Sequence, residues 1–259
     1  MNISFNELPL GQYTEEILKK QWPGVLKTRG VNEGRCEIVE LNGEHVLQVT
    51  AFKGKVGPQD GGVSFRSRFG ESFDEYTAEY KVRIQKDFEY VRGGKLPGLC
   101  GGSNPQGGAS TAKADGFSAR VMWRESGTLE QYIYYMDKEA QSQWGKDFLW
   151  TTGKNKHVTI TQDMWKSLGI HTDDRCYLTP DVWHTVKTYI KMNTPEKEDG
   201  KIITWLDDQE VLNLDLRFRK DDSFSVDSFQ FAVYFGGNEE SWSPEKDEKI
   251  YFKDFSFHS

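Results

Sequence analysis

Residues 116–136, GFSARVMWRESGTLEQYIYYM, read as two alternating β-strands joined by a tight turn. Successive side chains of a strand point to opposite faces of a sheet, so counting by twos separates the two faces. In the first half of the stretch, the apolar set is Phe117, Ala119, Val121 and Trp123, and the other set is Ser118, Arg120, Met122 and Arg124. The stretch therefore predicts a β-hairpin with one face in a core and the other facing away from it.

The register of this hairpin follows from its turn. A three-residue loop that ends with Gly127 in the left-handed conformation, after a type I turn, would join the two strands. That loop places Arg120 opposite Tyr132 and Ser118 opposite Tyr134. Both faces sort correctly in this register, and a one-residue slip would exchange them. The outer face would then carry a compact patch of serine, arginine and two tyrosines, which is the first candidate for a functional site.

The rest of the chain favours an all-β fold. The 259 residues include 25 glycines and 14% aromatic residues, and many short runs alternate between apolar and polar side chains. Ten or more antiparallel strands without helical crossovers predict two packed sheets, so we expect a β-jelly roll, a concanavalin-like sandwich with a concave substrate groove. Outside the hairpin, strands are expected at residues 35–41, 45–52, 62–69, 76–84, 148–152, 157–161, 181–192, 201–206, 210–216, 228–235 and 249–257, and one short helix at residues 13–21. With no internal repeat and no linker, residues 1–259 are expected to form a single domain.

The composition argues against several classes of function. A net charge of −7 disfavours a nucleic-acid partner. The longest uninterrupted apolar run, residues 231–235, is far too short to span a bilayer, so no membrane partner is expected. The three cysteines and five histidines are scattered without metal-site spacing, so we expect no metal and no cofactor. Residues 81–124 nevertheless contain eight basic and three acidic side chains, which fits either a polyanionic substrate or a solvated positive face.

A long glycine-rich stretch precedes the hairpin. Residues 93–115, GGKLPGLCGGSNPQGGASTAKAD, contain almost no β-branched residues, so we expect an irregular loop. Long loops inside compact domains tend to be functional, although a surface excursion without function is the alternative. The chemical asset of this stretch is Lys95, which stands beside a stiffening Pro97.

The outer face of the hairpin suggests chemistry based on tyrosine. A guanidinium beside a phenol favours the phenolate, so Arg120 is expected to help Tyr132 act as a base near neutral pH. Glycoside hydrolysis would need two carboxylates at a defined separation, and the hairpin offers only Glu130. Arg66 is a further candidate that could extend a basic groove. Aromatic residues are also common on strands for packing reasons alone.

Three motifs resemble one enzyme family. GGKLPGL at residues 93–99, GFSARVMWR at residues 116–124 and LEQYIYYM at residues 129–136 resemble the alginate lyases and glucuronan lyases of polysaccharide lyase family fourteen. Weaker likeness extends to residues 182–195 and 231–242. The resemblance implies a β-jelly roll whose catalytic residues match Lys95, Arg120, Tyr132 and Tyr134, with Ser118 holding the sugar. Arg66, Arg124 and Glu130 are expected to make further contacts with the substrate.

The resemblance also implies a reaction. The expected activity is β-elimination in a 1,4-linked polyuronate, either mannuronate-rich alginate or polyglucuronate, which leaves 4,5-unsaturated uronate ends. The partner would be this acidic polysaccharide, and we expect a monomer. We expect the protein to act outside the cell after removal of a signal peptide, with a cytoplasmic or virus-encoded protein as the alternative. The competing functions are a non-catalytic carbohydrate-binding module of the same fold and, less well supported, a glycoside hydrolase.

Overall fold

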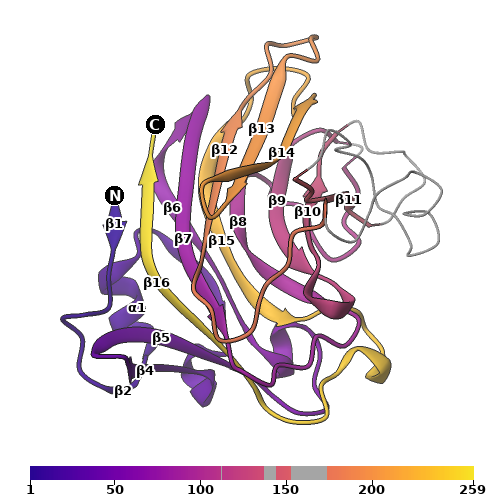
Figure 1. Ribbon diagram of the computed structural model, residues 1–259. Helices are drawn as coiled ribbons and strands as arrows, with labels where there is room; N and C mark the ends of the chain where they lie inside the picture. The colour runs from indigo at the N-terminus through magenta and orange to yellow at the C-terminus, as the bar shows by residue number, and fades with distance from the viewer. Residues whose placement is uncertain (112, 137–143, 153–173) are drawn as a thin grey trace.

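The computed structural model describes residues 1–259 except 112, 137–143 and 153–173. Over the described residues it contains two antiparallel sheets that pack against each other, with short helical segments outside them (Figure 1). The two layers follow from the alternating sequence, because each sheet has one apolar face to bury. The jelly-roll sandwich expected from the sequence is therefore confirmed.

Within the described residues, one sheet has nine strands and the other has seven. The nine-stranded sheet has the order β14-β13-β12-β7-β16-β5-β4-β2, with β1 paired to β16. Its strands are β1 (Asn2–Ile3), β2 (Gly11–Gln12), β4 (Cys36–Leu41), β5 (Glu44–Ala51), β7 (Glu75–Ile84), β12 (His184–Lys191), β13 (Gly200–Leu206), β14 (Gln209–Leu216) and β16 (Glu248–His258). The seven-stranded sheet, in the order β11-β10-β9-β8-β15-β6-β3, comprises β3 (Val25–Arg29), β6 (Val63–Phe73), β8 (Gly94–Gly102), β9 (Gly116–Trp123), β10 (Leu129–Tyr134), β11 (Lys146–Leu149) and β15 (Val226–Phe235).

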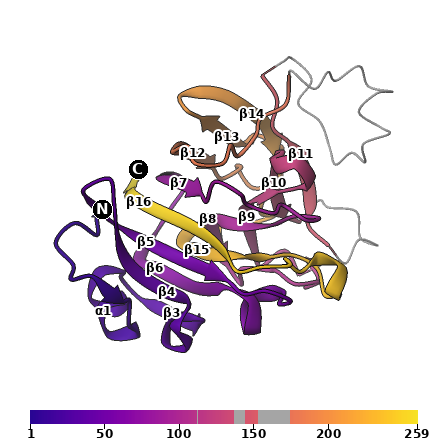
Figure 2. The same cartoon turned by 60° about the horizontal axis from the view of Figure 1, so that its bottom comes forward.

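Aromatic side chains fill the space between the sheets. The buried Trp22 ring stacks on Phe229 with centroids 6.0 Å apart and meets Phe255 edge-on at 5.0 Å, so it joins the two layers. Trp22 follows the helix α1 (Glu15–Gln21), which begins two residues later than expected because the Thr14 side chain caps it. A turned view shows α1 at the end of the molecule where β3 and β4 lie, away from β9, β10 and β11 (Figure 2).

The predicted hairpin register is confirmed, and its turn differs from the prediction. β9 and β10 pair Arg120 with Tyr132 and Ser118 with Tyr134. In the turn, Ser126 has φ 60° and Gly127 has φ 79°, so both residues are left-handed and the turn is not type I. A Cβ on Gly127 would lie 2.6 Å from the Tyr90 ring, which explains why glycine stands there.

The expectation that residues 93–115 are irregular is wrong for their first part. Residues 94–102 form β8, a central strand between β9 and β15. Its glycines serve close packing: a Cβ on Gly98 would lie 1.9 Å from the carbonyl oxygen of Ala119. A high glycine content predicts a loop only where close packing does not require a residue without a side chain. Here the neighbouring strand β9 requires glycine at position 98.

One expected strand lies outside the described residues, and one described strand does not follow from the sequence pattern. The strand expected at residues 157–161 lies outside the described residues. The short strand β3 was not expected, because its burial pattern does not alternate. No helix of the described part of the chain is long and apolar enough to cross a membrane.

Candidate active site

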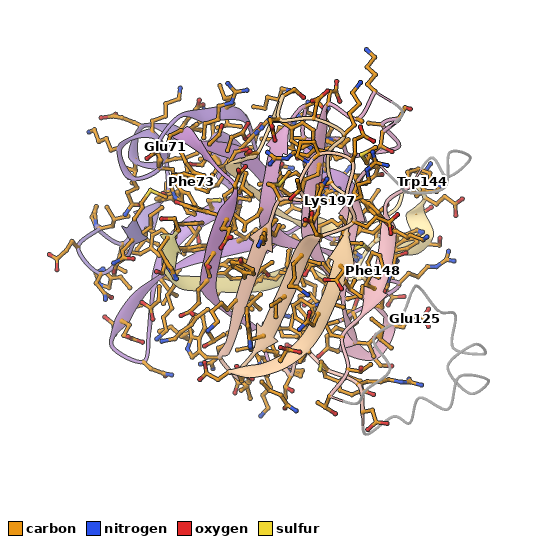
Figure 3. The ribbon with its side chains drawn as sticks, turned by 90° about the horizontal axis from the view of Figure 1, so that it is seen from above. Glu71, Phe73, Glu125, Trp144, Phe148 and Lys197 are labelled. Carbon is orange, nitrogen blue, oxygen red and sulfur yellow. The ribbon has the colours of Figure 1, made fainter. Side chains whose placement is uncertain are left out.

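The candidate site residues lie on three neighbouring strands of the seven-stranded sheet. On the face away from the core, β8 carries Lys95, β9 carries Ser118, Arg120 and Met122, and β10 carries Glu130, Tyr132 and Tyr134. The register places Lys95 beside Met122, and Met122 beside Glu130. The four residues predicted to be catalytic are therefore brought together by adjacent strands. Viewed from above, this β10–β11 end of the molecule, marked by Phe148 and Trp144, lies opposite Glu71 and Phe73 (Figure 3).

Lys95 lies in an apolar and aromatic environment. Its side chain is 8% exposed, and its Nζ contacts the Met122 sulfur and lies 3.4 Å from the centroid of the Tyr132 ring. Among the described residues, no carboxylate lies within ion-pair distance of it. Burial lowers the pKa of the Lys95 amine well below its usual value, and the cations of Arg120 and Arg124 lower it further. An amine in such a place loses its proton more easily than a solvated lysine, and a neutral amine can act as a base.

Arg120 is held from one side only. It is 1% exposed, and its Nη1 donates to Gln106 Oε1 at 3.3 Å and to the Tyr234 hydroxyl at 3.2 Å. Its Nε is buried and has no hydrogen-bond partner in the described part of the chain. A buried guanidinium with an unpaired N–H is costly in the free protein, and an anionic ligand would satisfy it.

The two site tyrosines receive backbone hydrogen bonds. The Gly145 N–H donates to the Tyr132 hydroxyl at 2.9 Å, the Gly108 N–H donates to the Tyr134 hydroxyl at 3.0 Å, and the two hydroxyl oxygens are 3.4 Å apart. Burial raises the pKa of the Tyr132 phenol, and its hydrogen bond with Tyr134 raises it further, while the Gly145 N–H opposes this. We expected Arg120 to lower this pKa. Desolvation outweighs the attraction because the Arg120 cation stands 5.7 Å from the ring centroid, in the same water-poor region.

The segment after β8 covers the site. Its Pro105 carbonyl accepts from the Ser118 hydroxyl at 2.6 Å, Gln106 binds Arg120, and Gly108 binds Tyr134. Through these three contacts, residues 105–108 lie over the outer face of the hairpin. Lys95 itself does not come from the loop, because it belongs to the strand that precedes it.

Arg124 donates hydrogen bonds to two acidic side chains, Glu130 and Asp147, beside these groups. Arg124 Nε donates to Glu130 Oε1 at 2.5 Å, and its Nη2 donates to Asp147 Oδ1 at 3.0 Å. Burial raises the pKa of Glu130 to about 8, Arg124 opposes this rise, and Asp147 adds to it. Arg124 and Glu130, which are predicted to contact the substrate, therefore lie at the site and are hydrogen-bonded to each other.

Arg66 stands apart from this group. It lies on β6, which β15 and β8 separate from β9. Its guanidinium donates to the Ser228 hydroxyl at 2.7 Å, to the Gly102 carbonyl at 2.9 Å and to Asp227 at 2.8 Å. The structure therefore places Arg66 in a network that holds β6, β8 and β15 together.

The sequence did not single out Tyr234, Gln106 or Gly145. Tyr234 lies on β15 directly beside Lys95, a pairing that depends on sheet order and leaves no local signal. Gly145 follows Trp144, whose side chain is 56% exposed at this end of the sheet. The exposure of Trp144 could have drawn attention to this segment, but exposure is a property of the folded chain and is not visible in the sequence.

No group of three or more histidine, cysteine, aspartate or glutamate side chains that could hold a metal ion occurs among the described residues. The three cysteines are free and buried. The groups that the site brings together are an amine, a guanidinium and two phenols. These groups suit proton transfer beside an anionic substrate.

Comparisons with known proteins agree with this fold. The chain matches the family described as polysaccharide lyase 14 over residues 40–255. Similar solved structures include the alginate lyase Aly36B, with 22% identity and a TM-score of 0.79 over 100% of this chain and 96% of that one. The PL-14 alginate lyase from Aplysia kurodai has 24% identity and a TM-score of 0.78, over 100% of this chain and 98% of that one. The alginate lyase vAL-1 from Chlorella virus has 22% identity and a TM-score of 0.71, over 97% of this chain and 99% of that one. No curated protein was found to match.

Proposed function

The chain belongs to the polysaccharide lyase 14 family and is a polysaccharide lyase, and we propose that it cleaves 1,4-linked polyuronates by β-elimination. The observation that carries the proposal is the meeting of Lys95, Arg120 and Tyr132 on one face of the sheet. The alginate lyases with the same fold support an acidic polysaccharide as substrate, and a mutant of Aly36B binds an alginate tetrasaccharide.

The reaction needs a cation at the uronate carboxylate. The C5 proton is weakly acidic because it lies α to a carboxylate, whose own charge opposes the formation of a carbanion. A guanidinium that binds both carboxylate oxygens stabilises the enolate-like dianion more than the ground state. Arg120 meets this need because its Nε is buried and unpaired.

Lys95 is the group best suited to take the C5 proton. Its lowered pKa makes a neutral amine easier to reach, whereas the raised pKa of Tyr132 favours the protonated phenol. The C5–H electron pair would form the C4–C5 double bond, the C4–O4 bond would break, and a phenol of Tyr132 or Tyr134 would protonate O4. The ammonium of Lys95 would then return its proton to the phenolate, which restores both groups.

A tyrosine base is the second candidate. The Gly145 and Gly108 N–H groups each donate to a site phenol, and such donors stabilise a phenolate. In that scheme Lys95 would neutralise the substrate carboxylate together with Arg120, and a tyrosine would return the proton to O4. The two schemes differ in which substitution removes the acidic limb of the pH profile.

The one-sided site favours particular sugars. In mannuronate and glucuronate, H5 and O4 lie on the same side of the sugar ring, so neighbouring groups on one face can serve both atoms. Guluronate, the C5 epimer, presents H5 on the opposite side and needs a group there. We therefore propose a preference for mannuronate-rich alginate or polyglucuronate over guluronate blocks.

A substrate panel tests this function. Polymannuronate, polyglucuronate and polyguluronate are incubated separately with the protein, and ultraviolet absorbance of the 4,5-unsaturated uronate is followed. We expect absorbance with the first two. Reducing ends without that absorbance would indicate a glycoside hydrolase, binding without any product would indicate a carbohydrate-binding module, and fastest cleavage of polyguluronate would contradict the one-sided scheme.

Hydrolysis has little support in this site. Glu130 and Asp147 are neighbouring acids, but both bind the guanidinium of Arg124. Hydrolases separate their two carboxyl groups across the scissile bond.

Because a polymer of this kind does not cross a membrane unaided, we also propose that the enzyme acts outside the cell, as a monomer.

A further inference from the structure

Tyr234 is a third tyrosine at the site, and it approaches from the side opposite the hairpin. It lies on β15, where its register partner on β8 is Lys95. Its side chain is 9% exposed, and its hydroxyl accepts the hydrogen bond from Arg120 Nη1 at 3.2 Å. Tyr234 falls within the weaker likeness of residues 231–242, but the chemistry proposed above gives it no role.

The hydrogen bonds of Arg120 divide its guanidinium into two edges. Nη1 is occupied by the Tyr234 hydroxyl and by Gln106 Oε1. Nε is buried without a partner among the described residues. The side-chain hydrogen bonds that Arg120 makes to described residues come from Nη1 and not from Nη2. Nε and Nη2 carry N–H groups on one side of the planar guanidinium, which matches the two oxygens of a carboxylate.

The backbone at Tyr234 is fixed in place. β15 pairs with β6 on one side and β8 on the other, so its backbone cannot shift without breaking two ladders. The Gly62 backbone also packs tightly against it, since a Cβ on Gly62 would lie 2.7 Å from Tyr234 Cβ. A phenol anchored in this way fixes the direction of the guanidinium that it binds.

We propose that Tyr234 is a positioning residue that holds Arg120 by Nη1, so that its Nε–Nη2 edge receives the uronate carboxylate in the transition state. This rests on the proposed function. Gln106 supports the same nitrogen from the covering loop. Tyr234 would then act through Arg120 alone, and its hydroxyl would matter only while a guanidinium is present to be oriented.

The test is a double-mutant cycle. Tyr234→Phe keeps the ring and removes the acceptor, and Arg120→Lys keeps the charge and removes the bidentate edge. On polymannuronate we expect Tyr234→Phe to lower kcat by about tenfold or more with KM changed by less than about threefold, because the dianion forms only after binding. In the Arg120→Lys background, the same substitution should cost less than about threefold, since a lysine has no edge to orient. Tyr189→Phe, which removes a surface hydroxyl bonded to Glu75, is the matched control and should leave kcat unchanged.

Each outcome decides the proposal. Equal costs of Tyr234→Phe in both backgrounds, or no loss of kcat, would overturn it while product formation by the wild type leaves the lyase function intact. If no polyuronate yields unsaturated product with the wild type, the proposed function fails and this inference fails with it. Should Tyr234→Phe not fold, as judged by its thermal unfolding, Gln106→Leu removes the other acceptor of Nη1 and must show the same fall in kcat.

Discussion

Lys95 places its Nζ 3.4 Å from the centroid of the Tyr132 ring, so the proposed base and a proposed acid are in contact. A charged ammonium would gain from the ring's negative face. Burial opposes that charge, and it also opposes ionisation of the phenol. Both groups are therefore favoured in their neutral forms, which are the forms that a base and an acid need at the start of the reaction.

Lys95→Met should separate activity from stability. The variant keeps a buried chain of similar length and loses the amine, so we expect kcat/KM to fall by about 10²–10⁴. The folded pKa of Lys95 is depressed, so between that pKa and its unfolded value the unfolded state binds more protons, and the wild-type free energy of unfolding rises with pH. Within that range the cost to the wild type grows by about 1.4 kcal/mol for each pH unit below the unfolded pKa, and the variant escapes it.

The measurement is urea unfolding across neutral and alkaline pH. Lys95→Met should be more stable at neutral pH and show a flatter pH dependence than the wild type. Lys187→Met is the control, because that half-buried lysine lies 4.8 Å from the Trp205 ring centroid on the other sheet. A less stable Lys95→Met would mean that Lys95 is charged and paired in the native protein.

Tyr132→Phe and Tyr134→Phe test the proton donor. Each keeps the ring packing and removes one phenol, so loss of the donor should lower kcat by about 10²–10⁴. If Lys95 is the base, the surviving activity keeps the acidic limb of the kcat/KM profile. If a tyrosine is the base, that limb disappears in one of the two variants. Undiminished turnover in both would remove tyrosine from the mechanism.

Glu130→Gln should extend activity to higher pH. The pKa of Glu130 is raised to about 8, so below that pH the carboxyl is neutral beside Arg124 and Asp147. As pH rises through that value, the new negative charge repels the polyanion and lowers kcat/KM. The amide cannot ionise, so the variant should keep its rate at high pH. Its stability relative to the wild type should rise with pH from the ordinary glutamate pKa of about 4.3 up to about pH 8 and stay constant above that. An alkaline limb that is identical in the variant and the wild type would contradict this role.

Gly98→Ala should disrupt the strand that carries Lys95. The added Cβ would lie 1.9 Å from the Ala119 carbonyl oxygen and 2.7 Å from Arg120 Cα, so β8 and β9 must move apart. We expect a loss of about 3 kcal/mol or more in the free energy of unfolding, with lower activity. Gly54→Ala, at a left-handed position with nothing within 4 Å, should cost only about 1 kcal/mol. Equal urea midpoints for the two variants would show that the strands can adjust.

The hairpin could be predicted because its signals are local. Alternation along residues 116–136 sorts two faces, and only one register keeps both sorted, so the Arg120–Tyr132 pairing followed from sequence. The turn type did not follow, because Ser126 adopts a left-handed conformation that its residue type does not favour. The sequence of strand β8 predicts a loop because its glycines are required by neighbours that are distant in sequence.

The catalytic and binding roles of the site residues stay predictions. The structure brings Lys95, Arg120, Tyr132 and Tyr134 together and adds Tyr234 and Gln106 to them. It leaves Arg66 in a separate network with Asp227. Proximity of this kind depends on the order of strands across the sheet, which alternation within one strand does not encode.

The sequence by itself determined the two-sheet class, the inward and outward faces of the hairpin, and the residues that its outer face presents. Those properties depend on contacts within a few residues of each other. The tertiary structure alone decided that β15 lies beside β8, which brings Tyr234 to Lys95 and Arg120. It also decided the direction of the pKa changes: Arg120 beside Tyr132 favours a phenolate, but the removal of water from the whole site favours the phenol, and burial is a property of the complete fold.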